Sequence, residues 1–277
     1  VQERAELIML SDIAGYVGAD TCGCLLAIRQ DQQEEISLMI DIGTNGEMVL
    51  GNRERMVTCS TAAGPAFEGA KIECGMRGAA GAVDHVKYED GKWNYTTVGN
   101  KPAVGLCGSG LIDLVAGLLD AGMLDENGVL RSGQEKQGVF ILVPPERGGN
   151  ERGVYLTQKD LGEVQLAKAA IAAGIQMLME RLGISEDDIC SVYIAGAFGN
   201  YMDPVSAGKI GLLPATLVKK VKPVGNAAGE GAKIALVNEK ERLGMDELVR
   251  KIEFVELAAS ADFQDHFIDE LGFETGE

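Results

Sequence analysis

The sequence predicts a layered α/β fold, in which helices cover a β-sheet. Short apolar runs typical of buried strands, such as 36–42 and 192–195, alternate with longer segments whose apolar residues recur every three or four positions. Glycine-bearing turns follow several of these runs directly, as at the strand-to-helix junctions of α/β proteins. A chain of 277 residues is long enough to bury such a core without disulfides.

Composition and charge exclude several classes of function. The net charge of −17 and the lack of a Lys/Arg run argue against a nucleic-acid partner. The sequence has neither 18 consecutive apolar residues nor a leader, so we expect no membrane association and a cytoplasmic location. Six cysteines without a CxxC spacing, and only two histidines, predict reduced thiols rather than a metal site. The chain starts at Val1, so we expect a processed product or a fragment.

The N-terminal half predicts short elements. Residues 2–9 indicate a helix, and a second short helix should end near Ile28. Two β-rich runs, 36–42 and 47–50, flank a GTNG turn, which predicts a hairpin with glycine at positive φ. The Gly/Ala-rich segment 58–83 is too irregular for one helix and too apolar for an exposed loop, so it should pack at a site or interface. Further on we expect a strand over 93–98 and a helix over 111–121.

The C-terminal half carries the clearest helical periodicity. Apolar residues at steps of three and four predict a helix over 159–182, ended by Gly183. Before it, residues 125–152 predict a surface excursion around a strand-like run at 139–143. The elements expected after the long helix are strands at 192–195 and 221–225, a helix reaching 234–243, a further helix, a strand at 252–257, and an amphipathic helix carrying Phe263, Phe267, Ile268 and Leu271.

Three glycine turns carry the chemistry. They are DIGTNGE (41–47), AGAFGN (195–200) and GNAAGEGA (225–232), and each follows a predicted strand. In the first, the carboxylate of Asp41 ends a buried strand beside backbone N–H groups and the Thr44 hydroxyl. Such a turn suits a phosphate chain and its Mg²⁺. A plain Asn-Gly hairpin is the alternative for the first turn, and an ordinary strand-to-helix turn for the others.

Together the turns resemble the nucleotide site of the actin, sugar kinase and Hsp70 superfamily. There a DxGTT or DxGTN sequence forms the phosphate loop of an RNase H-like lobe, an α/β fold with a mixed sheet flanked by helices, here with insertions. The resemblance implies ATP and Mg²⁺ as ligands. It makes Asp41 and Glu47 the catalytic pair, with Asp41 holding Mg²⁺ through water. The implied phosphate contacts are Gly43, Thr44, Asn45 and Gly46; the implied adenosine contacts are Gly196, Ala197, Phe198, Gly199, Asn200, Gly225, Asn226 and Ala227. Core packing is the alternative for Phe198.

Longer phrases resemble one family more closely. STAAGPAFEGAKI, GMRGAAGAV, GLCGSGLIDL, AGAFGNYMDPVSAGKIGLLP and GNAAGEGAK are similar to the C-terminal ATPase region of reductive activators of corrinoid proteins. That family uses ATP to return cob(II)alamin to cob(I)alamin. The implied partner is a corrinoid protein, either a corrinoid iron–sulfur protein or a methyltransferase corrinoid subunit, and we expect a homodimer.

This resemblance also implies a domain organisation. Residues 1–277 would be the C-terminal ATPase region, with a phosphate-loop hairpin (36–50), an insertion and linking region (51–158) and an adenosine-binding part (159–277). The upstream lobe and a [2Fe-2S] domain are expected elsewhere in the parent protein, so catalysis by this chain alone should be incomplete.

Two other functions stay open at this stage. A small-molecule kinase of the same superfamily would share the glycine turns, and a non-catalytic docking module of a corrinoid methyltransferase system would need no turnover. GPAFEGA and GMRGAAGAV carry Glu68 and Arg77 as candidates for a loop facing a partner or the nucleotide, with tight packing of small residues as the alternative.

Overall fold

The computed structural model describes residues 7–131, 138–258 and 260–273. Most of the helix expected over 2–9 therefore lies outside the described residues, and the described part, residues 7–9, is not helical. Leu7 and Met9 are 90% and 81% exposed. The prediction is therefore wrong for residues 7–9, where the exposed side chains offer no buried face to stabilise a helix.

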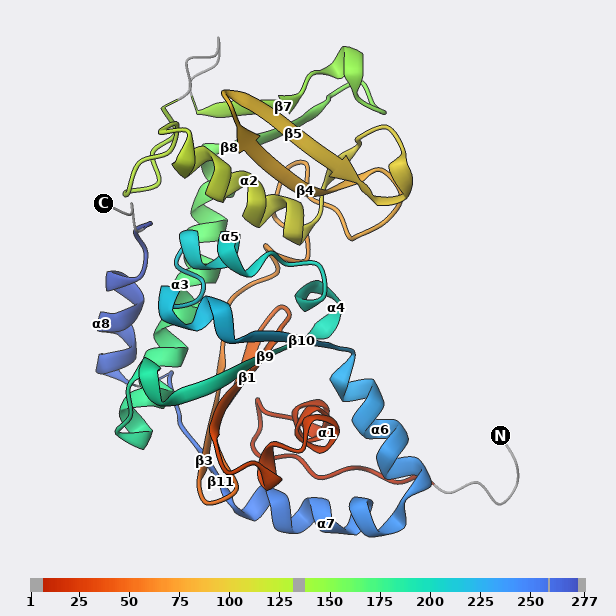
Figure 1. Cartoon of the computed structure of the whole chain (residues 1–277), viewed down its shortest axis with the longest axis vertical. Coiled ribbons are helices and arrows are strands. Elements are labelled where there is room, and N and C mark those ends of the chain that lie inside the picture. The colour runs from red at the N-terminus through yellow and green to blue at the C-terminus, as the bar shows by residue number, and fades with distance from the viewer. Residues whose placement is uncertain (1–6, 132–137, 259, 274–277) are drawn as a thin grey trace.

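A six-stranded mixed sheet forms the centre of the molecule, in the order β10-β9-β1-β2-β3-β11. The pairs β1–β2 and β2–β3 are antiparallel, whereas β9 pairs in parallel with β1 and β10, and β11 pairs in parallel with β3. This arrangement confirms the predicted α/β class with a mixed sheet (Figure 1). The strands are β1 (Ile36–Ile42), β2 (Gly46–Gly51), β3 (Met56–Thr61), β9 (Ile189–Ala195), β10 (Val221–Gly225) and β11 (Ile252–Phe254).

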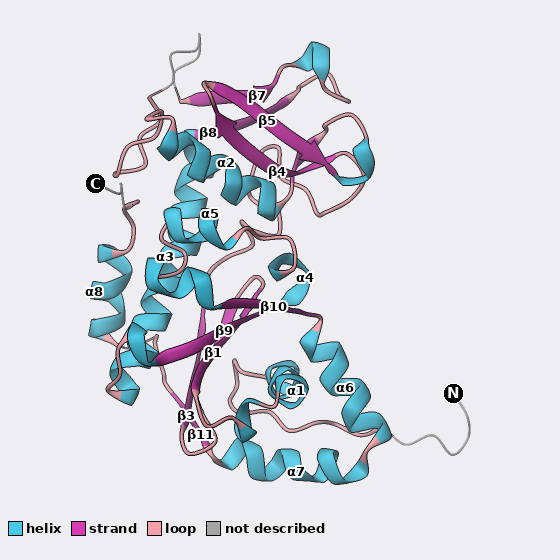
Figure 2. Ribbon diagram, in the orientation of Figure 1, coloured by secondary structure: helices cyan, strands magenta, loops and turns pink. Residues whose placement is uncertain are grey.

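Helices cover both faces of this sheet (Figure 2). Alternate side chains of a strand point to opposite faces. Leu38 and Ile40 of β1 join the core that includes α3, whereas Met39 packs with Leu25 of α1. Asp41 follows Met39 at a spacing of two, so it lies on the α1 side. The helices of that side are α1 (Ala19–Ile28), α6 (Ala227–Val237) and α7 (Glu239–Arg250); α3 (Gln158–Leu182) and α8 (Ala261–Asp269) lie on the other.

The segment between β3 and α3 builds two smaller sheets beside the large one. Their strand orders are β5-β4-β6 and β7-β8, and α2 packs on β4. Since β3 pairs in the large sheet, the predicted insertion, 51–158, leaves that sheet only after Thr61. The elements of this region are β4 (Ala82–Glu89), β5 (Lys92–Thr97), β6 (Gly105–Leu106), α2 (Gly108–Asp120), β7 (Val139–Val143) and β8 (Val154–Thr157).

The expected surface excursion over 125–152 is wrong in part. Phe140 and Val143 of β7 are buried, and Phe140 contacts Trp93 with ring centroids 4.9 Å apart. The polar residues around this strand obscured its pairing with β8. The Gly/Ala-rich segment does pack, but strands β3 and β4 occupy its two ends, which the small residues also hid.

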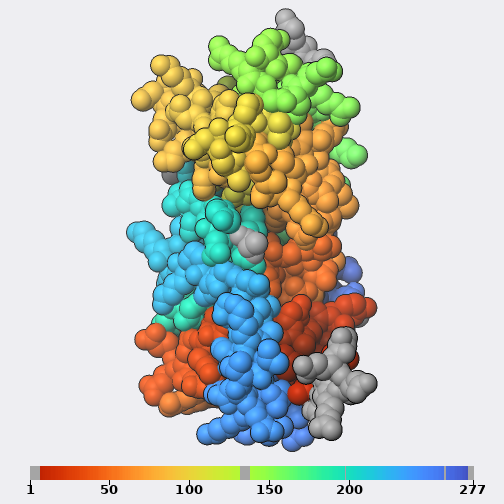
Figure 3. All heavy atoms as spheres, turned by 90° about the vertical axis from the view of Figure 1, so that its right-hand side faces the viewer, coloured from red at the N-terminus to blue at the C-terminus, as the bar shows by residue number. Residues whose placement is uncertain are grey.

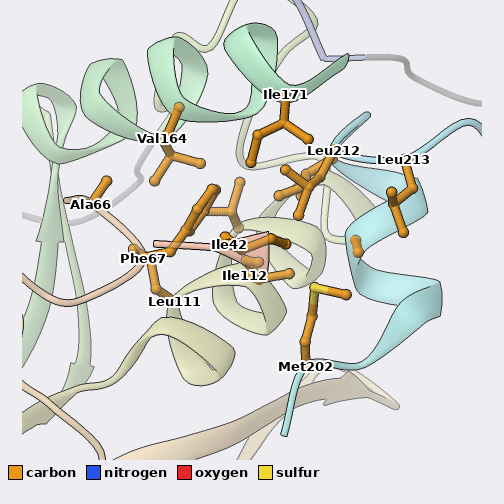
Figure 4. Packing of buried hydrophobic residues seen from close by; sticks show 14 of the residues in the cluster. Ile42, Ala66, Phe67, Leu111, Ile112, Val164, Ile171, Met202, Leu212 and Leu213 are labelled. Carbon is orange, nitrogen blue, oxygen red and sulfur yellow. The ribbon is translucent and has the colours of Figure 1, made fainter. Parts of the chain in front are cut away.

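The long helix α3 links the large and small sheets. A capping box starts it: the Thr157 hydroxyl accepts from the Asp160 backbone N–H at 3.2 Å, and Asp160 accepts from the Thr157 N–H at 2.9 Å. Gly183 ends it at φ 71°, as predicted. Figure 4 shows side chains of α3, Val164 and Ile171, packed above Phe67 and Leu111 at the junction of the layers.

Other predicted bounds shift. The helix expected to reach 234–243 ends earlier, at Val237, because Asn238 starts the next helix, α7, by accepting from the Glu241 N–H. The strand expected over 252–257 ends at Phe254, and the last helix ends before Leu271. Within the described residues, no helix combines the length and apolar character needed to cross a membrane. A short helix, α4 (Gly196–Gly199), and a second one, α5 (Pro204–Lys209), follow β9.

Candidate functional site

One row of the large sheet brings the predicted residues together. In the strand registers, Glu47 lies opposite Asp41, Asp41 beside Ala195, and Ala195 beside Gly225. Each of the three glycine turns therefore begins at or within two residues of the same row. Asp41 and Gly225, 184 positions apart in sequence, lie in one row because the carboxyl ends of the parallel strands β1, β9 and β10 share one edge.

Asp41 and Glu47 form a cross-strand pair on the hairpin. Cross-strand partners of this kind have Cβ atoms about 5 Å apart. Burial raises the pKa of both carboxyl groups, and the charge of Asp20 raises the pKa of Asp41 further, while the Cys24 thiol, 3.8 Å from Asp41 Oδ2, lowers it. Ser60 donates to Glu47 Oε1 at 3.2 Å, which lowers the pKa of Glu47 in part. The site thus concentrates negative charge in a partly dehydrated position.

The hairpin turn differs from the predicted one. Neither Gly43 nor Gly46 has positive φ. Gly46 is required for space instead, because a Cβ there would lie 2.9 Å from Thr61 Oγ1. Thr44 and Asn45 are exposed at the tip, and the Thr44 hydroxyl donates to Glu68 Oε1 at 2.6 Å.

The turn after β9 passes close to the carboxylate. Gly196 has φ 87°, and a Cβ on it would lie 3.0 Å from Asp41 Oδ1. Only glycine lets the backbone approach the carboxylate in this conformation without strain. Asn200, at the end of α4, lies against Gly225, where a Cβ would be 3.1 Å from Asn200 Nδ2.

The turn after β10 is closed by a helix cap. The Asn226 side chain accepts from the Gly229 N–H at 2.9 Å and starts α6, so the N-terminus of this helix follows directly on the row. Ala227 is 2% exposed and packs against the α1 side of the sheet.

Phe198 packs rather than standing free. Its ring stacks on Phe67 with centroids 5.7 Å apart and an interplanar angle of 13°. Gly108, at the start of α2, also packs against this ring, since a Cβ there would lie 2.8 Å from Phe198 Cε2. This is the packing alternative for Phe198. The side chain of its neighbour Ala197 lies outside the part of the chain that the structure describes.

Sequence reasoning missed two polar residues of the site. Asp20 lies in the first turn of α1, close enough for its charge to raise the pKa of Asp41 and Glu47. Ser60 lies opposite Glu47 on β3. The signal for Asp20 was available, because an acid after Gly-Ala and before an apolar run is typical of a helix start. Glu68, in contrast, was a candidate and contacts the predicted phosphate loop.

These residues fit a magnesium nucleotide. Burial and the charge of Asp20 raise the pKa of Asp41 and Glu47, no described Lys or Arg is among the groups that act on them, and a divalent cation would supply positive charge at this place. The residues that would hold it are Asp41 and Glu47, and the hairpin amides and the α6 N-terminus suit phosphate oxygens. The described residues hold no cluster of three His, Cys, Asp or Glu ligands, so a cation would need ligands from phosphate or water.

Known proteins share this architecture. A family model described as the C-terminal domain of RACo, the ASKHA domain, matches residues 35–277. The chain belongs to this family. The membership confirms the resemblance to reductive activators of corrinoid proteins and the ASKHA-type fold.

Relatives in this family carry informative names. The corrinoid activation enzyme RamQ of Eubacterium limosum is 38% identical, over 97% of this chain and 47% of that protein. A [Co(II) methylated amine-specific corrinoid protein] reductase of Methanosarcina barkeri is 32% identical, over 98% of this chain and 52% of that protein. A solved reductive activator for corrinoid,iron-sulfur protein superposes with a TM-score of 0.89 at 39% identity, covering 95% of this chain and 44% of that one. The chain thus spans about half the length of these relatives.

Proposed function

We propose that this chain is the ATP-binding part of a reductive activator, which couples ATP to the reduction of cob(II)alamin to cob(I)alamin in a corrinoid protein. The observation that carries the proposal is the single sheet row that joins Asp41 and Glu47 to the turns after β9 and β10. Relatives named as a corrinoid activation enzyme and a Co(II) corrinoid protein reductase support the choice of partner.

The residues of this row and of the turns beside it would have different roles. Asp41 and Glu47 would hold the magnesium-bound water and orient the attacking water at the terminal phosphate, and the hairpin amides would bind phosphate oxygens. Gly196, Asn200 and Asn226 lie at the two turns that would hold adenosine. Mg²⁺ supplies charge neutralisation of the phosphates when bound. The proposed domain division of 36–50, 51–158 and 159–277 follows this assignment, with a second lobe and a [2Fe-2S] domain in the longer protein.

ATP would act by changing the conformation rather than by phosphorylating a metabolite. One external electron converts cob(II)alamin to cob(I)alamin, and no phosphoryl group appears in the product. The energy of ATP binding and hydrolysis would therefore shift the equilibrium between open and closed arrangements of the site, and with it the docking of the corrinoid protein. We further propose that the active protein is a homodimer in the cytoplasm.

The test is spectroscopic. The protein, in the full length that its gene encodes, is mixed with a purified cob(II) corrinoid protein and a chemical reductant, with ATP or without nucleotide. Conversion to the cob(I) spectrum only with ATP supports the proposal. ATP-independent reduction, or no reduction with any corrinoid partner while ATP phosphorylates a small metabolite, would overturn it in favour of a kinase.

A further inference from the structure

The hydroxyl of Thr44 and the carboxylate of Glu68 form a pair at the tip of the phosphate-loop hairpin. The distance from Thr44 Oγ1 to Glu68 Oε1 is 2.6 Å, within the range of hydrogen bonds from a hydroxyl to a carboxylate. Glu68 overlies the turn, since a Cβ on Gly43 would lie 3.8 Å from its Oε1. A residue from the segment after β3 therefore fixes the hydroxyl of the predicted phosphate loop.

Backbone hydrogen bonds fix the chain at both Thr44 and Glu68. The Gly64 N–H donates to the Thr44 carbonyl oxygen at 2.8 Å, and the Glu68 N–H donates to the Pro65 carbonyl oxygen at 3.2 Å. Between them, Phe67 is 3% exposed and stacked on Phe198. Glu68 is thus attached to a turn whose backbone is held by hydrogen bonds and by the buried Phe67, which keeps its carboxylate within reach of the exposed Thr44 hydroxyl.

The direction of this hydrogen bond decides what Thr44 can bind. A hydroxyl has one hydrogen and two lone pairs, and an ionised carboxylate only accepts. With its hydrogen directed at Glu68, Thr44 Oγ1 presents lone pairs alone. A phosphate oxygen is also an acceptor and gains nothing from them, whereas Mg²⁺ takes oxygen lone pairs. The negative charge of Glu68 disfavours a bare phosphate at the same place and favours a cation.

We propose that Glu68 is a positioning residue that turns the Thr44 hydroxyl into a magnesium ligand, so that the loop selects the Mg²⁺ complex of the nucleotide over the free nucleotide. This inference rests on the proposed nucleotide-binding function and revises one detail of it, because Thr44 was expected to contact phosphate.

The experiment measures the dissociation constant of ATP by calorimetry, once with excess Mg²⁺ and once with EDTA, for the full-length protein. The ratio of the EDTA value to the Mg²⁺ value reports selection of the metal complex. Glu68→Ala frees the hydroxyl hydrogen for phosphate, so the ratio should fall by more than about threefold. A smaller fall would overturn the proposal.

Three further variants separate orientation from charge and from folding. Glu68→Gln keeps an oxygen acceptor and should retain most of the ratio; a loss equal to that of Glu68→Ala would show that only charge matters and would sink the positioning role. In a Thr44→Val background, Glu68→Ala should not change the ratio further. A fall in the ratio as large as that in the unmodified background would also overturn the positioning role. Glu73→Ala is the matched control and should leave the ratio unchanged. Glu73 lies in the same segment as Glu68 and also accepts a hydroxyl hydrogen bond, but its donor is Tyr155, away from the hairpin.

The outcomes distinguish this inference from the function it rests on. Nucleotide binding by the unmodified protein with an unchanged ratio in Glu68→Ala rejects the role of Glu68 alone. No nucleotide binding by the unmodified protein under either condition rejects the proposed function and this inference with it.

Discussion

Gly231 of α6 packs directly on the backbone of Gly23 in α1: a Cβ at Gly231 would lie 1.9 Å from the Gly23 carbonyl oxygen. The reverse approach is also close, since a Cβ at Gly23 would lie 2.9 Å from the Ala228 carbonyl oxygen. The backbones of the two helices are therefore in direct contact. This contact places Asp20 of α1 and the N-terminus of α6 on the face of the large sheet that carries Asp41. Figure 3 shows α6 along the face of the molecule on which these segments meet.

Gly231→Ala should therefore destabilise the protein. The added methyl group forces α1 and α6 apart, and overpacking of this kind costs about 1–3 kcal/mol. Chemical denaturation monitored by circular dichroism measures the loss. Gly244→Ala is the control, because Gly244 is an exposed residue of α7 and a Cβ there would meet no atom within 4 Å, so stability should stay equal or rise. Equal effects of the two substitutions would contradict the close contact.

In the full-length protein, Asp41→Asn should abolish ATP turnover and leave the fold intact. The folded state raises the pKa of Asp41, so ionisation of this carboxyl group destabilises the folded protein. The protonated Asp41 contributes stability that is fully present below the unfolded pKa and is lost as pH rises through the folded pKa. At neutral pH the neutral asparagine should therefore be no less stable. Phosphate release and thermal melting measure the two effects. Asp187→Asn, near the opposite end of β9, is the control, and normal turnover in Asp41→Asn would reject the site.

Binding of the magnesium nucleotide should weaken as pH falls, beginning above the pH at which an ordinary aspartate titrates. The reason is the raised pKa of Asp41, caused first by burial and then by the charge of Asp20. Asp20→Asn removes that neighbouring charge, lowers the pKa of Asp41 and should move the loss of affinity to lower pH. A titration of nucleotide affinity against pH checks both statements. An unchanged midpoint in Asp20→Asn would show that the two carboxylates do not interact.

Asn226→Ala should affect both stability and nucleotide affinity. Loss of the N-cap costs about 1 kcal/mol and loosens the turn that carries the first N–H groups of α6. Asn238→Ala removes the matching cap of α7, where the Glu241 N–H is 3.3 Å from the side chain. Denaturation should show similar losses for both variants, whereas calorimetry should show weaker nucleotide binding for Asn226→Ala alone. Equal affinities would mean that the α6 turn does not contact the nucleotide.

Much of the sheet and its glycine turns could be predicted from sequence. The runs at 36–42 and 192–195 are apolar on both faces because helices cover both sides of their strands, and such runs are visible without a structure. The long helix was equally clear, since its period and its glycine end are local signals. The site row follows from these elements once parallel pairing of β1, β9 and β10 is assumed.

What sequence reasoning missed depends on distant partners. β3 reads as the start of a Gly/Ala-rich segment, and only its pairing with β2 and β11 makes it a strand. The exposure of Phe198 could not be decided because Phe67 stacks on it from a segment about 130 positions away. The glycines of the hairpin were assigned to positive φ, whereas Gly46 is needed for the proximity of Thr61 and Ile171, which no local pattern reveals.

The 25-residue helix α3 also sets the mechanics of the molecule. At 1.5 Å per residue it is about 37 Å long, and it reaches from the end of β8 in the small sheets along β2 and β3 of the large one. A continuous helix of this length bends little, so we expect the small sheets to move together with the large sheet rather than as a hinged flap. On the proposed function, a displacement of the hairpin on nucleotide binding should tilt α3 as a whole and so move the small sheets at its other end.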